Sequence, residues 1–291
     1  MPLKIAIASG KGGTGKTTVA TNLFHLYCNN ITCNIHLVDC DVEEPNDIIF
    51  FPHAVKNSEH EVFQHIPQIN TKNCTFCRQC VEYCEFNAII VIPSASFAEI
   101  NPNLCHSCGA CSVACKYDAI IEMPASIGEV THYEIRKGMT IIEGRLKIGS
   151  AMQTMLIKKL KKQIPDESGI IILDSPPGTS CPVVETISDA DYIILVTEPT
   201  PFGLHDLKLM VDLIREIKKP FGIVISKADI GDNKVYKFLK EEQIDLLGEI
   251  PFSKDYAGLY AAGNIFHTVP SQIQESYLKI IENLENKINI V

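Results

Sequence analysis

Near its start the chain reads Gly10-Lys11-Gly12-Gly13-Thr14-Gly15-Lys16-Thr17, between an apolar run from Leu3 to Ala8 and a stretch with helical apolar spacing from Thr17 to Tyr27. The apolar run is typical of a buried strand, so this region predicts a strand, a glycine-rich turn and a helix. The eight residues satisfy the P-loop pattern, in the strand-to-helix context that its mechanism requires. Its glycines let backbone N–H groups converge on phosphate oxygens, helped by the positive end of the following helix. A turn that binds nothing is disfavoured because both the pattern and its context are satisfied.

Two side chains of this loop have distinct expected roles. Lys16 is expected to reach the β- and γ-phosphates of a nucleotide, and the Thr17 hydroxyl is expected to bind Mg²⁺. The other expected nucleotide-binding positions of the loop are Gly10, Gly12, Gly13, Thr14, Gly15 and Thr18.

Beyond the loop the chain alternates strands and helices, with one interruption. Ile35 to Val38 predicts a second strand, and strand, helix and strand within this length form a βαβ unit. The rhythm is lost from about residue 51 to 125 and then resumes, with predicted strands at 170–173, 192–196, 221–226 and 246–250 and predicted helices at 152–164, 204–218 and 272–288. We therefore expect an α/β fold with a doubly wound, mostly parallel sheet, built from residues 1–58 and 127–291 and interrupted by a module at 59–126.

The interrupting segment holds most of the chain's twelve cysteines in an internal repeat with an offset of 31 residues. Cys74-Thr-Phe-Cys-Arg-Gln-Cys-Val-Glu-Tyr-Cys aligns with Cys105-His-Ser-Cys-Gly-Ala-Cys-Ser-Val-Ala-Cys. Each half reads C-x₂-C-x₂-C-x₃-C, the spacing of bacterial ferredoxins with two [4Fe–4S] clusters, in which the fourth cysteine of each half serves the other cluster. The expected cluster ligands are Cys74, Cys77, Cys80 and Cys115 for one cluster, and Cys105, Cys108, Cys111 and Cys84 for the other.

Zinc is the alternative occupant of these cysteines, since C-x₂-C pairs also make zinc knuckles. Zinc sites use two pairs, whereas this repeat offers a triplet and a distant fourth cysteine. Dense cysteines in a reducing compartment also indicate metal or redox chemistry rather than disulfides. The insert is therefore expected to be a two-cluster, ferredoxin-like α+β module.

Composition excludes several other classes of protein. The chain has 291 residues, of which 46% are hydrophobic and 21% charged, values that are ordinary for a globular protein. Its formal net charge of −9 disfavours nucleic acid or an anionic membrane as a main partner. No apolar run approaches the length of about eighteen residues that a membrane span needs. The N-terminal apolar run is interrupted too soon for a signal peptide, so a cytoplasmic location is expected.

Lys11 adds a family resemblance to the loop. The run Lys-Gly-Gly-Thr-Gly-Lys-Thr from Lys11 to Thr17 is a deviant Walker A loop, and in it the chain resembles the MinD/ParA/Mrp/NifH group of P-loop ATPases. The resemblance implies that Lys11 crosses a dimer interface to the nucleotide of the partner subunit. The working form would then be a nucleotide-sandwich dimer, either a homodimer or a heterodimer with a paralogue.

The same resemblance assigns acidic residues at two strand ends. Asp39 and Asp41 stand at the place of switch I, where Asp39 is expected at the Mg²⁺ site and Asp41 resembles the residue that orients the attacking water or the Mg²⁺ shell. Ile170-Ile-Ile-Leu-Asp174-Ser-Pro-Pro-Gly178 resembles Walker B and switch II, so Asp174 is expected to hold Mg²⁺ through water and the Gly178 N–H to sense the γ-phosphate. Carboxyl ends of strands are where open α/β sheets bind ligands.

The base of the nucleotide is expected at Ser226, Lys227 and Pro251. Ser226-Lys227 follows a strand where the group usually has an asparagine, and a serine cannot reproduce the two-sided hydrogen bonding of an amide. ATP is therefore favoured by the resemblance and not by these residues.

Taken together, the two halves resemble the MinD-superfamily P-loop ATPases that contain an inserted ferredoxin domain, over essentially the whole chain. The resemblance implies slow, partner-dependent ATP hydrolysis, coupled to electron transfer through two [4Fe–4S] clusters and to a redox protein partner. The first alternative is an iron–sulfur cluster carrier or metallocofactor assembly ATPase of the Mrp type. Those relatives use a C-x-x-C pair near the C-terminus, and no cysteine follows Cys181 here. A positioning ATPase with structural clusters is disfavoured because the chain has no basic tail.

Two features outside the motifs also have expected places. Cys181 follows Asp174 by seven residues, and a small packed thiol is expected there rather than a ligand of a cluster shared by two subunits. The final helix has mixed charges, so we expect it to pack against the sheet rather than bind a membrane.

Overall fold

The computed structural model describes residues 2–30, 33–166 and 169–288. Its strands are β1 Leu3–Ala8, β2 Asn34–Asp39, β3 Val55–Ile69, β4 Ile89–Ile92, β5 Phe97–Ile100, β6 Ile120–Arg136, β7 Met139–Leu146, β8 Gly169–Asp174, β9 Tyr192–Thr197, β10 Phe221–Ser226 and β11 Leu246–Ile250. Its α-helices are α1 Lys16–Asn30, α2 Gln79–Glu82, α3 Ala110–Ala114, α4 Gln153–Lys161, α5 Cys181–Ile187, α6 Pro201–Glu216, α7 Lys234–Glu241, α8 Lys254–Ala261 and α9 Ser271–Ile288, with 3₁₀ turns η1 Asp47–Phe50 and η2 Pro93–Ala95.

The chain forms two compact units. The first comprises Met1–Glu59, Thr131–Gly144 and Ile157–Val291, and the second comprises His60–Val130 and Arg145–Leu156. The cysteine repeat lies in the second unit, and the P-loop segment lies in the first.

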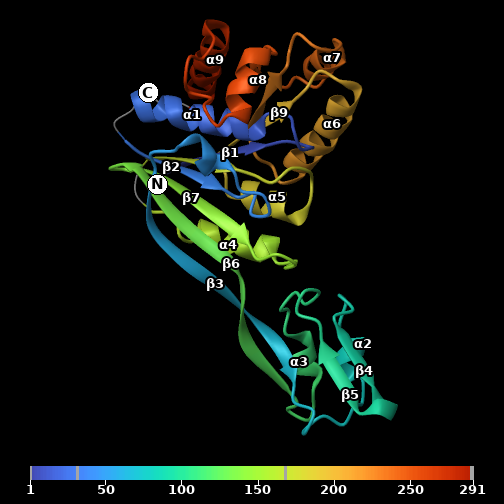
Figure 1. Cartoon of the computed structure of the whole chain (residues 1–291). Helices are drawn as coiled ribbons and strands as arrows, with labels where there is room; N and C mark the ends of the chain where they lie inside the picture. The colour runs from blue at the N-terminus through green and yellow to red at the C-terminus, as the bar shows by residue number, and fades with distance from the viewer. Residues whose placement is uncertain (1, 31–32, 167–168, 289–291) are drawn as a thin grey trace. The chain divides into compact units, whose positions relative to one another are not determined.

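A large sheet is the basis of the first unit, with strand order β11-β10-β9-β1-β8-β2-β7-β6-β3 (Figure 1). Each pair of neighbouring strands from β11 to β7 is parallel, and β1 lies between β8 and β9. Only two residues join β6 to β7, and such a short connection requires an antiparallel pair. The expectation of an α/β fold with a large, mostly parallel sheet is therefore confirmed.

Both faces of this sheet are covered, as a parallel sheet requires. One face packs against α1 and α9, whose buried residues recur at helical spacing, and Figure 1 shows α1, α8 and α9 on the side of the sheet opposite α5. In α9 the buried residues are Ile273, Tyr277, Ile280 and Leu284, so this helix packs on the core as expected. Among the described residues, no helix is both long and apolar enough to cross a membrane.

The second unit has a smaller core. The antiparallel strands β4 and β5 form its two-stranded sheet, with Ile89 opposite Ile100. Its buried cluster is made of Ile66, Ala88, Ile89, Val91, Ala98, Ile100, Cys105 and Cys111. Two of these core residues are cysteines of the repeat, so the integrity of this core depends on the cysteines themselves.

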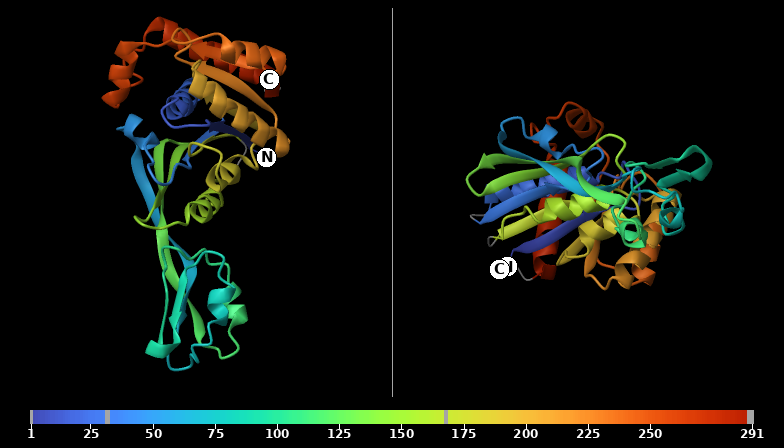
Figure 2. Two further views of the ribbon diagram at one scale, coloured as in Figure 1. Left: turned by 90° about the vertical axis from the view of Figure 1, so that its right-hand side faces the viewer. Right: turned by 90° about the horizontal axis from the view of Figure 1, so that it is seen from below.

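The long strands β3 and β6 were not expected from the sequence, which loses its periodicity there. They are neighbours in the large sheet, and Figure 2 shows them side by side in blue and green. The first half of β3 is mostly exposed and polar, because β3 is the edge strand of the sheet. Its strand conformation thus comes from hydrogen bonding to β6 rather than from burial, and apolar patterning gives no sign of that.

Candidate functional site

A cleft of about 1290 Å³ opens where β1, β2, β8, β10 and β11 end, at the carboxyl edge of the sheet. Of the residues expected to bind nucleotide, those that line it are Lys11, Gly12, Gly13, Thr14, Gly15, Lys16, Thr17, Thr18, Asp41, Ser226, Lys227 and Pro251. Gly10, Asp39 and Asp174 do not line this cleft. The fold thus brings together segments from both ends of the first unit.

Two glycines of the loop are required by the backbone. Gly15 has a φ of +91°, a conformation that L side chains rarely adopt. Gly10 lies so close to α6 that a Cβ atom there would come within 2.6 Å of the backbone oxygen of Asp206. The shape of the loop therefore depends on glycine at both positions.

Lys16 and Thr17 both contact Asp174 at the end of β8. The Nζ of Lys16 lies 2.8 Å from Asp174 Oδ1, and the Thr17 hydroxyl donates to Asp174 Oδ2 at 2.7 Å. Burial acts to lower the pKa of Lys16, but the charge and hydrogen bond of Asp174 outweigh it and raise the pKa above its usual value. The lysine is therefore an ammonium ion, ready to contact phosphate.

Three carboxyl groups gather behind Lys16. Asp39, Asp47 and Asp174 are all buried, and their carboxylate oxygens lie within 4.8 Å of one another. Burial and then the charge of Asp174 raise the pKa of Asp39 to about 8, although backbone N–H groups of Asp47 and Asn46 donate to it. Burial followed by the charges of Asp39 and Asp174 raises the pKa of Asp47 as well.

Asp41 lies apart from this group, half-buried on the wall of the cleft. Burial raises its pKa to about 6, while the charge of Lys16 acts in the opposite direction. Asp41 thus presents an ionisable carboxyl group to the phosphate region, the place expected for a group that orients water.

Lys11 forms an ion pair inside its own chain. Its Nζ lies 3.0 Å from Oε2 of Glu198, and Lys227 contacts Oε1 of the same glutamate. The Glu198 side chain is only 10% exposed. Burial acts to raise the pKa of Glu198, but the hydrogen bonds from Lys227 and Lys11 outweigh it and lower that pKa. One glutamate therefore holds both lysines at the mouth of the cleft.

The side chain of Ser226 supports the loop. Its hydroxyl lies 2.6 Å from the backbone oxygen of Thr14 and 3.1 Å from that of Thr197. The Ser226 hydroxyl, which was expected to contact the nucleotide base, is therefore hydrogen-bonded within the chain. These hydrogen bonds connect the end of β10 to the P-loop. The nearby wall of the cleft includes the aromatic residues Phe252, Tyr256 and Tyr260. The Gly178 N–H, expected to sense phosphate, donates to the backbone oxygen of Ser9 at 2.9 Å.

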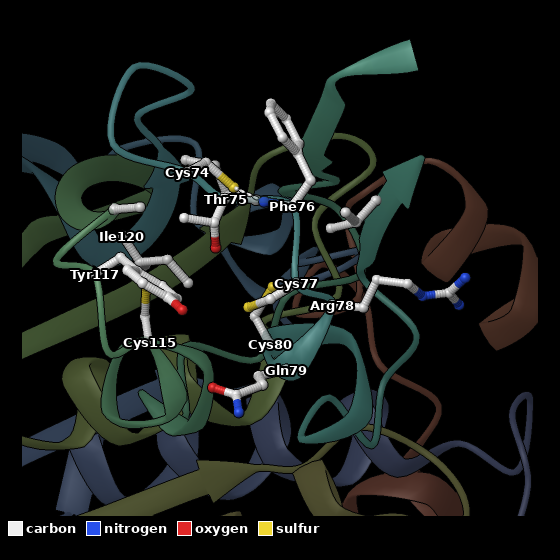
Figure 3. Close-up of a pocket in the computed structure, with 13 residues that line it drawn as sticks. Cys74, Thr75, Phe76, Cys77, Arg78, Gln79, Cys80, Cys115, Tyr117 and Ile120 are labelled. Atoms are coloured by element: carbon white, nitrogen blue, oxygen red, sulfur yellow. Dashed lines mark hydrogen bonds between the residues drawn. The ribbon is translucent and has the colours of Figure 1, made fainter. Parts of the chain in front are cut away.

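In the second unit, one hollow of about 360 Å³ is lined by Cys74, Cys77, Cys80 and Cys115. Figure 3 shows these four sulfur atoms around one space, with the side chain of Arg78 directed away from it. The first three cysteines come from the first half of the repeat, and Cys115 comes from the second.

A second hollow, of about 330 Å³, is lined by Cys105, Cys108, Cys111 and Cys84. Here the triplet comes from the second half of the repeat, and Cys84 comes from the first. The imidazole of His106 stacks on the ring of Phe86 at a centroid distance of 3.9 Å, and both residues line this hollow. The structure therefore groups the eight cysteines into the two sets given by the repeat.

The two halves also repeat their backbone conformation. Left-handed φ angles occur at Phe76, Arg78 and Asn87, and again 31 residues later at Ser107, Gly109 and Asp118. These turns direct backbone N–H groups at sulfur: Phe76 donates to Cys74 Sγ at 3.4 Å, and Ser107 donates to Cys105 Sγ at 3.4 Å. Non-glycine residues in this conformation carry a backbone cost, so both halves are shaped around their cysteines.

Burial also affects the thiols of these hollows. It raises the pKa of Cys80 to about 11 and raises the pKa values of Cys105 and Cys111. A thiol must lose its proton to bind a metal, so loading releases protons.

Sequence reasoning missed two residues beside the cleft and misplaced one cysteine. Asp47 and Glu198 belong to no motif; Asp47 lies against Asp39 of the same loop and Asp174 of β8, and Glu198 pairs with Lys11 and Lys227. Cys181, expected to be packed, is exposed at the start of α5, so that prediction was wrong. The first turn of this short helix leaves the side chain in solvent.

A family model for the CobQ/CobB/MinD/ParA nucleotide-binding domain matches residues 5–266 of the chain. An uncharacterized protein of Methanocaldococcus jannaschii is 33% identical over 289 residues, which cover 98% of each chain. An iron-sulfur cluster carrier protein of Pyrococcus furiosus is 22% identical, over 98% of this chain and 86% of the carrier.

Solved structures show the same fold. The cell division ATPase MinD of Pyrococcus furiosus aligns with a TM-score of 0.57 at 18% identity, over 99% of this chain and 100% of the other. A plasmid partition protein of Borrelia burgdorferi, bound to AMPPNP, aligns with a TM-score of 0.58 at 17% identity, over 99% and 100%.

Proposed function

The chain belongs to the CobQ/CobB/MinD/ParA family of nucleotide-binding domains, and we propose that it is an ATP-dependent iron–sulfur protein that couples nucleotide binding to electron transfer. In this proposal residues 1–58 and 127–291 form the ATPase, and residues 59–126 form a ferredoxin-like insert with two [4Fe–4S] clusters. The observation that carries the proposal is the presence of two four-cysteine hollows on the same chain as a P-loop cleft.

The cleft fits a magnesium nucleotide. Lys16 would contact the β- and γ-phosphates, the Thr17 hydroxyl would bind Mg²⁺, and Asp39 and Asp174 would orient its water ligands. Bound Mg²⁺ neutralises phosphate charge during hydrolysis. Asp41, on the cleft wall, would orient the attacking water. The donor set supports this assignment, because hydroxyl and carboxylate oxygens are the ligands that Mg²⁺ prefers.

The hollows fit four-iron clusters better than single zinc ions. Each is lined by four cysteines, and each triplet is completed by a cysteine from the other half of the repeat, whereas zinc sites use two pairs. Backbone N–H groups donate hydrogen bonds to the sulfur atoms of Cys74, Cys84 and Cys105. Hydrogen bonds of this kind tune the reduction potential of a cluster. Two such clusters would supply one-electron transfer.

Chain connectivity supports coupling between the two functions. Asp39 and Asp41 precede η1, and only four residues separate η1 from β3, which continues into the second unit. A nucleotide-dependent change at Asp41 would therefore reach the insert through a short stretch of chain. Lys11 would leave Glu198 and contact the nucleotide of a second subunit, which makes the working form a dimer, homomeric or with a paralogue.

Cluster transfer is the alternative function, favoured by the 22% identity to a carrier protein. A carrier gives up its cluster, whereas each hollow here has a complete set of four cysteine ligands. Incubation with an apo-ferredoxin distinguishes the two functions. Loss of iron to the acceptor would favour the carrier, and retained iron would favour electron transfer.

The test of the proposed function is a redox titration followed by EPR, on protein purified without oxygen. It is run with and without Mg²⁺ and a non-hydrolysable ATP analogue. We expect two interacting [4Fe–4S]⁺ signals whose potentials or coupling move with nucleotide in the wild type but not in Lys16→Gln. Signals that ignore nucleotide in both proteins would contradict coupling, and the absence of an iron signal would contradict the cluster assignment.

A further inference from the structure

Asp47 has an environment that its neighbours alone do not explain. It lies in η1 with an exposed fraction of 0%, and among the described residues neither of its carboxylate oxygens has a hydrogen-bond partner. Leaving a buried polar group without a partner costs free energy, and a buried carboxylate costs more than a neutral group. The side chain is nevertheless placed within 4.8 Å of the carboxylates of Asp39 and Asp174.

The charges around Asp47 do not balance. Asp39, Asp47 and Asp174 bring three carboxyl groups together, and the ammonium of Lys16 compensates one of them at Asp174. The charge of Glu143, another buried acid, further disfavours ionisation of Asp47.

The other lysines, at the mouth of the cleft, do not compensate the remaining negative charge of these carboxylates. Lys11 and Lys227 both pair with Glu198 and not with this group. If Asp39, Asp47 and Asp174 all lose their protons, as ligation of a metal requires, Lys16 leaves two of their three negative charges uncompensated, which one divalent cation would balance.

The three carboxyl groups come from rigid and separate parts of the first unit. Asp39 ends β2 and Asp174 ends β8, and these strands are paired in parallel with the two aspartates opposite each other. Backbone N–H groups of Asp41 and Asn46 donate to Asp39 at 3.1 and 2.8 Å, which fixes the loop that carries Asp47. The oxygens are therefore held in place and need not be gathered by a ligand.

We propose that Asp39, Asp47 and Asp174 form a binding site for a divalent cation of the Mg²⁺ or Mn²⁺ class, and that this site is filled before nucleotide binds. Hard cations of this class take carboxylate oxygens and keep some water ligands. Asp47 is the new ligand, since it lies outside the P-loop, switch and Walker B motifs. The inference rests on the nucleotide site of the proposed function, but not on hydrolysis or on the clusters.

The site also makes cation and nucleotide cooperative. A nucleotide phosphate would draw the ammonium of Lys16 away from Asp174, which leaves three carboxylates to be compensated. A cation should then bind more tightly in the presence of nucleotide, and by linkage the nucleotide should bind more tightly in the presence of the cation.

The test uses the full chain with its iron retained, freed of nucleotide by desalting under anaerobic conditions. Mn²⁺ is titrated in, and the free ion is followed by its EPR signal. We expect one saturable Mn²⁺ per chain for the wild type, and at least tenfold weaker binding for Asp47→Asn. The matched control is Glu43→Gln, which removes an exposed acid of the same loop and should bind Mn²⁺ as the wild type does.

Two further measurements keep the result interpretable. Mn²⁺ should raise the thermal midpoint of the wild type and leave that of Asp47→Asn unchanged, although the variant itself folds. A fluorescent ATP analogue, titrated separately, reports whether the cleft still binds nucleotide, so a failure of the proposed function is seen independently. The proposal is overturned if the nucleotide-free wild type shows no saturable Mn²⁺ binding, or if Asp47→Asn binds Mn²⁺ as tightly as the wild type.

Discussion

The nucleotide cleft and the cysteine hollows are built on different principles. In the cleft most charged groups already have partners within the chain: Lys16 pairs with Asp174, and Lys11 pairs with Glu198. In the hollows the functional groups are thiols, two of which, Cys77 and Cys108, are exposed. The cleft is therefore held by ion pairs between distant side chains, whereas the loops of the hollows are held by backbone hydrogen bonds, some of them to sulfur.

The two units also differ in the size of their hydrophobic cores. The first unit packs strands of its sheet between layers of helices, and its largest fully buried side chains include Tyr27 and Tyr277. The second unit has a small core in which Cys105 and Cys111 take part. Small domains of this kind are commonly stabilised by metal ligation. Ligand removal should thus affect the two regions unequally.

The largest expected effect is the loss of structure in the second unit when a cluster ligand is removed. Cys80→Ser should lower amide protection in residues 60–130 by roughly a hundredfold or more, because metal ligation is folding free energy in small metal-binding domains. Hydrogen exchange read by mass spectrometry measures this, and protection around Leu23 and Ile172 should persist. Cys33→Ser, at a half-buried position outside the repeat, is the control. Unchanged protection in Cys80→Ser would show that the hollows hold themselves together.

Next in size is the effect of Lys16→Gln on nucleotide binding. The amide can still donate to Asp174, so the fold and the iron content should stay as in the wild type. Loss of the charged contact to phosphate should weaken binding of a fluorescent ATP analogue by roughly a hundredfold, since charge-assisted hydrogen bonds contribute about 1.5–3 kcal/mol each.

Lys4→Gln supplies the comparison for this variant. Lys4 pairs with Asp189 on the surface of the same unit and does not line the cleft. If both variants bind the analogue equally well, the cleft does not use Lys16 for phosphate.

A smaller effect is expected from Glu198→Gln, which releases Lys11 and Lys227 from their shared partner. With ATP analogue and Mg²⁺ present, dimers should form at about tenfold lower protein concentration, because about 1.4 kcal/mol of a competing ion pair is lost. Sedimentation velocity across a dilution series measures the shift. Glu242→Gln breaks an exposed ion pair with Arg215 and should leave the dimer unchanged. A dimer weakened by Glu198→Gln would mean that the glutamate supports association.

The smallest effect concerns the cysteines outside the repeat. Cys181→Ala should leave iron at about eight per chain, the content of two four-iron clusters. In the wild type, iodoacetamide should modify the exposed Cys181 and spare Cys28 and Cys40, because burial raises the pKa of Cys28 to about 12 and raises that of Cys40. Peptide mass spectrometry reads both results. A fall in iron content in the alanine variant would make Cys181 a cluster ligand.

The sequence predicted the parts of the molecule that local rules determine. The strand before the P-loop, the loop and the helix after it follow from apolar spacing and from glycines. The grouping of Cys115 with the first cysteine triplet could be predicted because it follows from the spacing of the cysteines in the repeat. In contrast, β3 is a strand because β6 lies beside it, and a polar edge strand has no apolar alternation of its own.

The residues that were missed have the same explanation. Asp47 has its place through Asp39 and Asp174, and Glu198 through Lys11 and Lys227. Apart from Asp39 and Asp47, which share one loop, these relations join segments that are far apart along the chain. Charge compensation in a folded site depends on such neighbours, and a local pattern cannot report it.

The exchange of the fourth cysteine between the two halves has a consequence for stoichiometry. Since Cys115 completes the set of the first half and Cys84 that of the second, neither half can assemble a full ligand set from its own residues. Under the proposed function, loading of one hollow would hold parts of both halves together and so prepare the other hollow. Under the proposed function, a population of these chains at limiting iron would divide into fully loaded and empty molecules, with few in between.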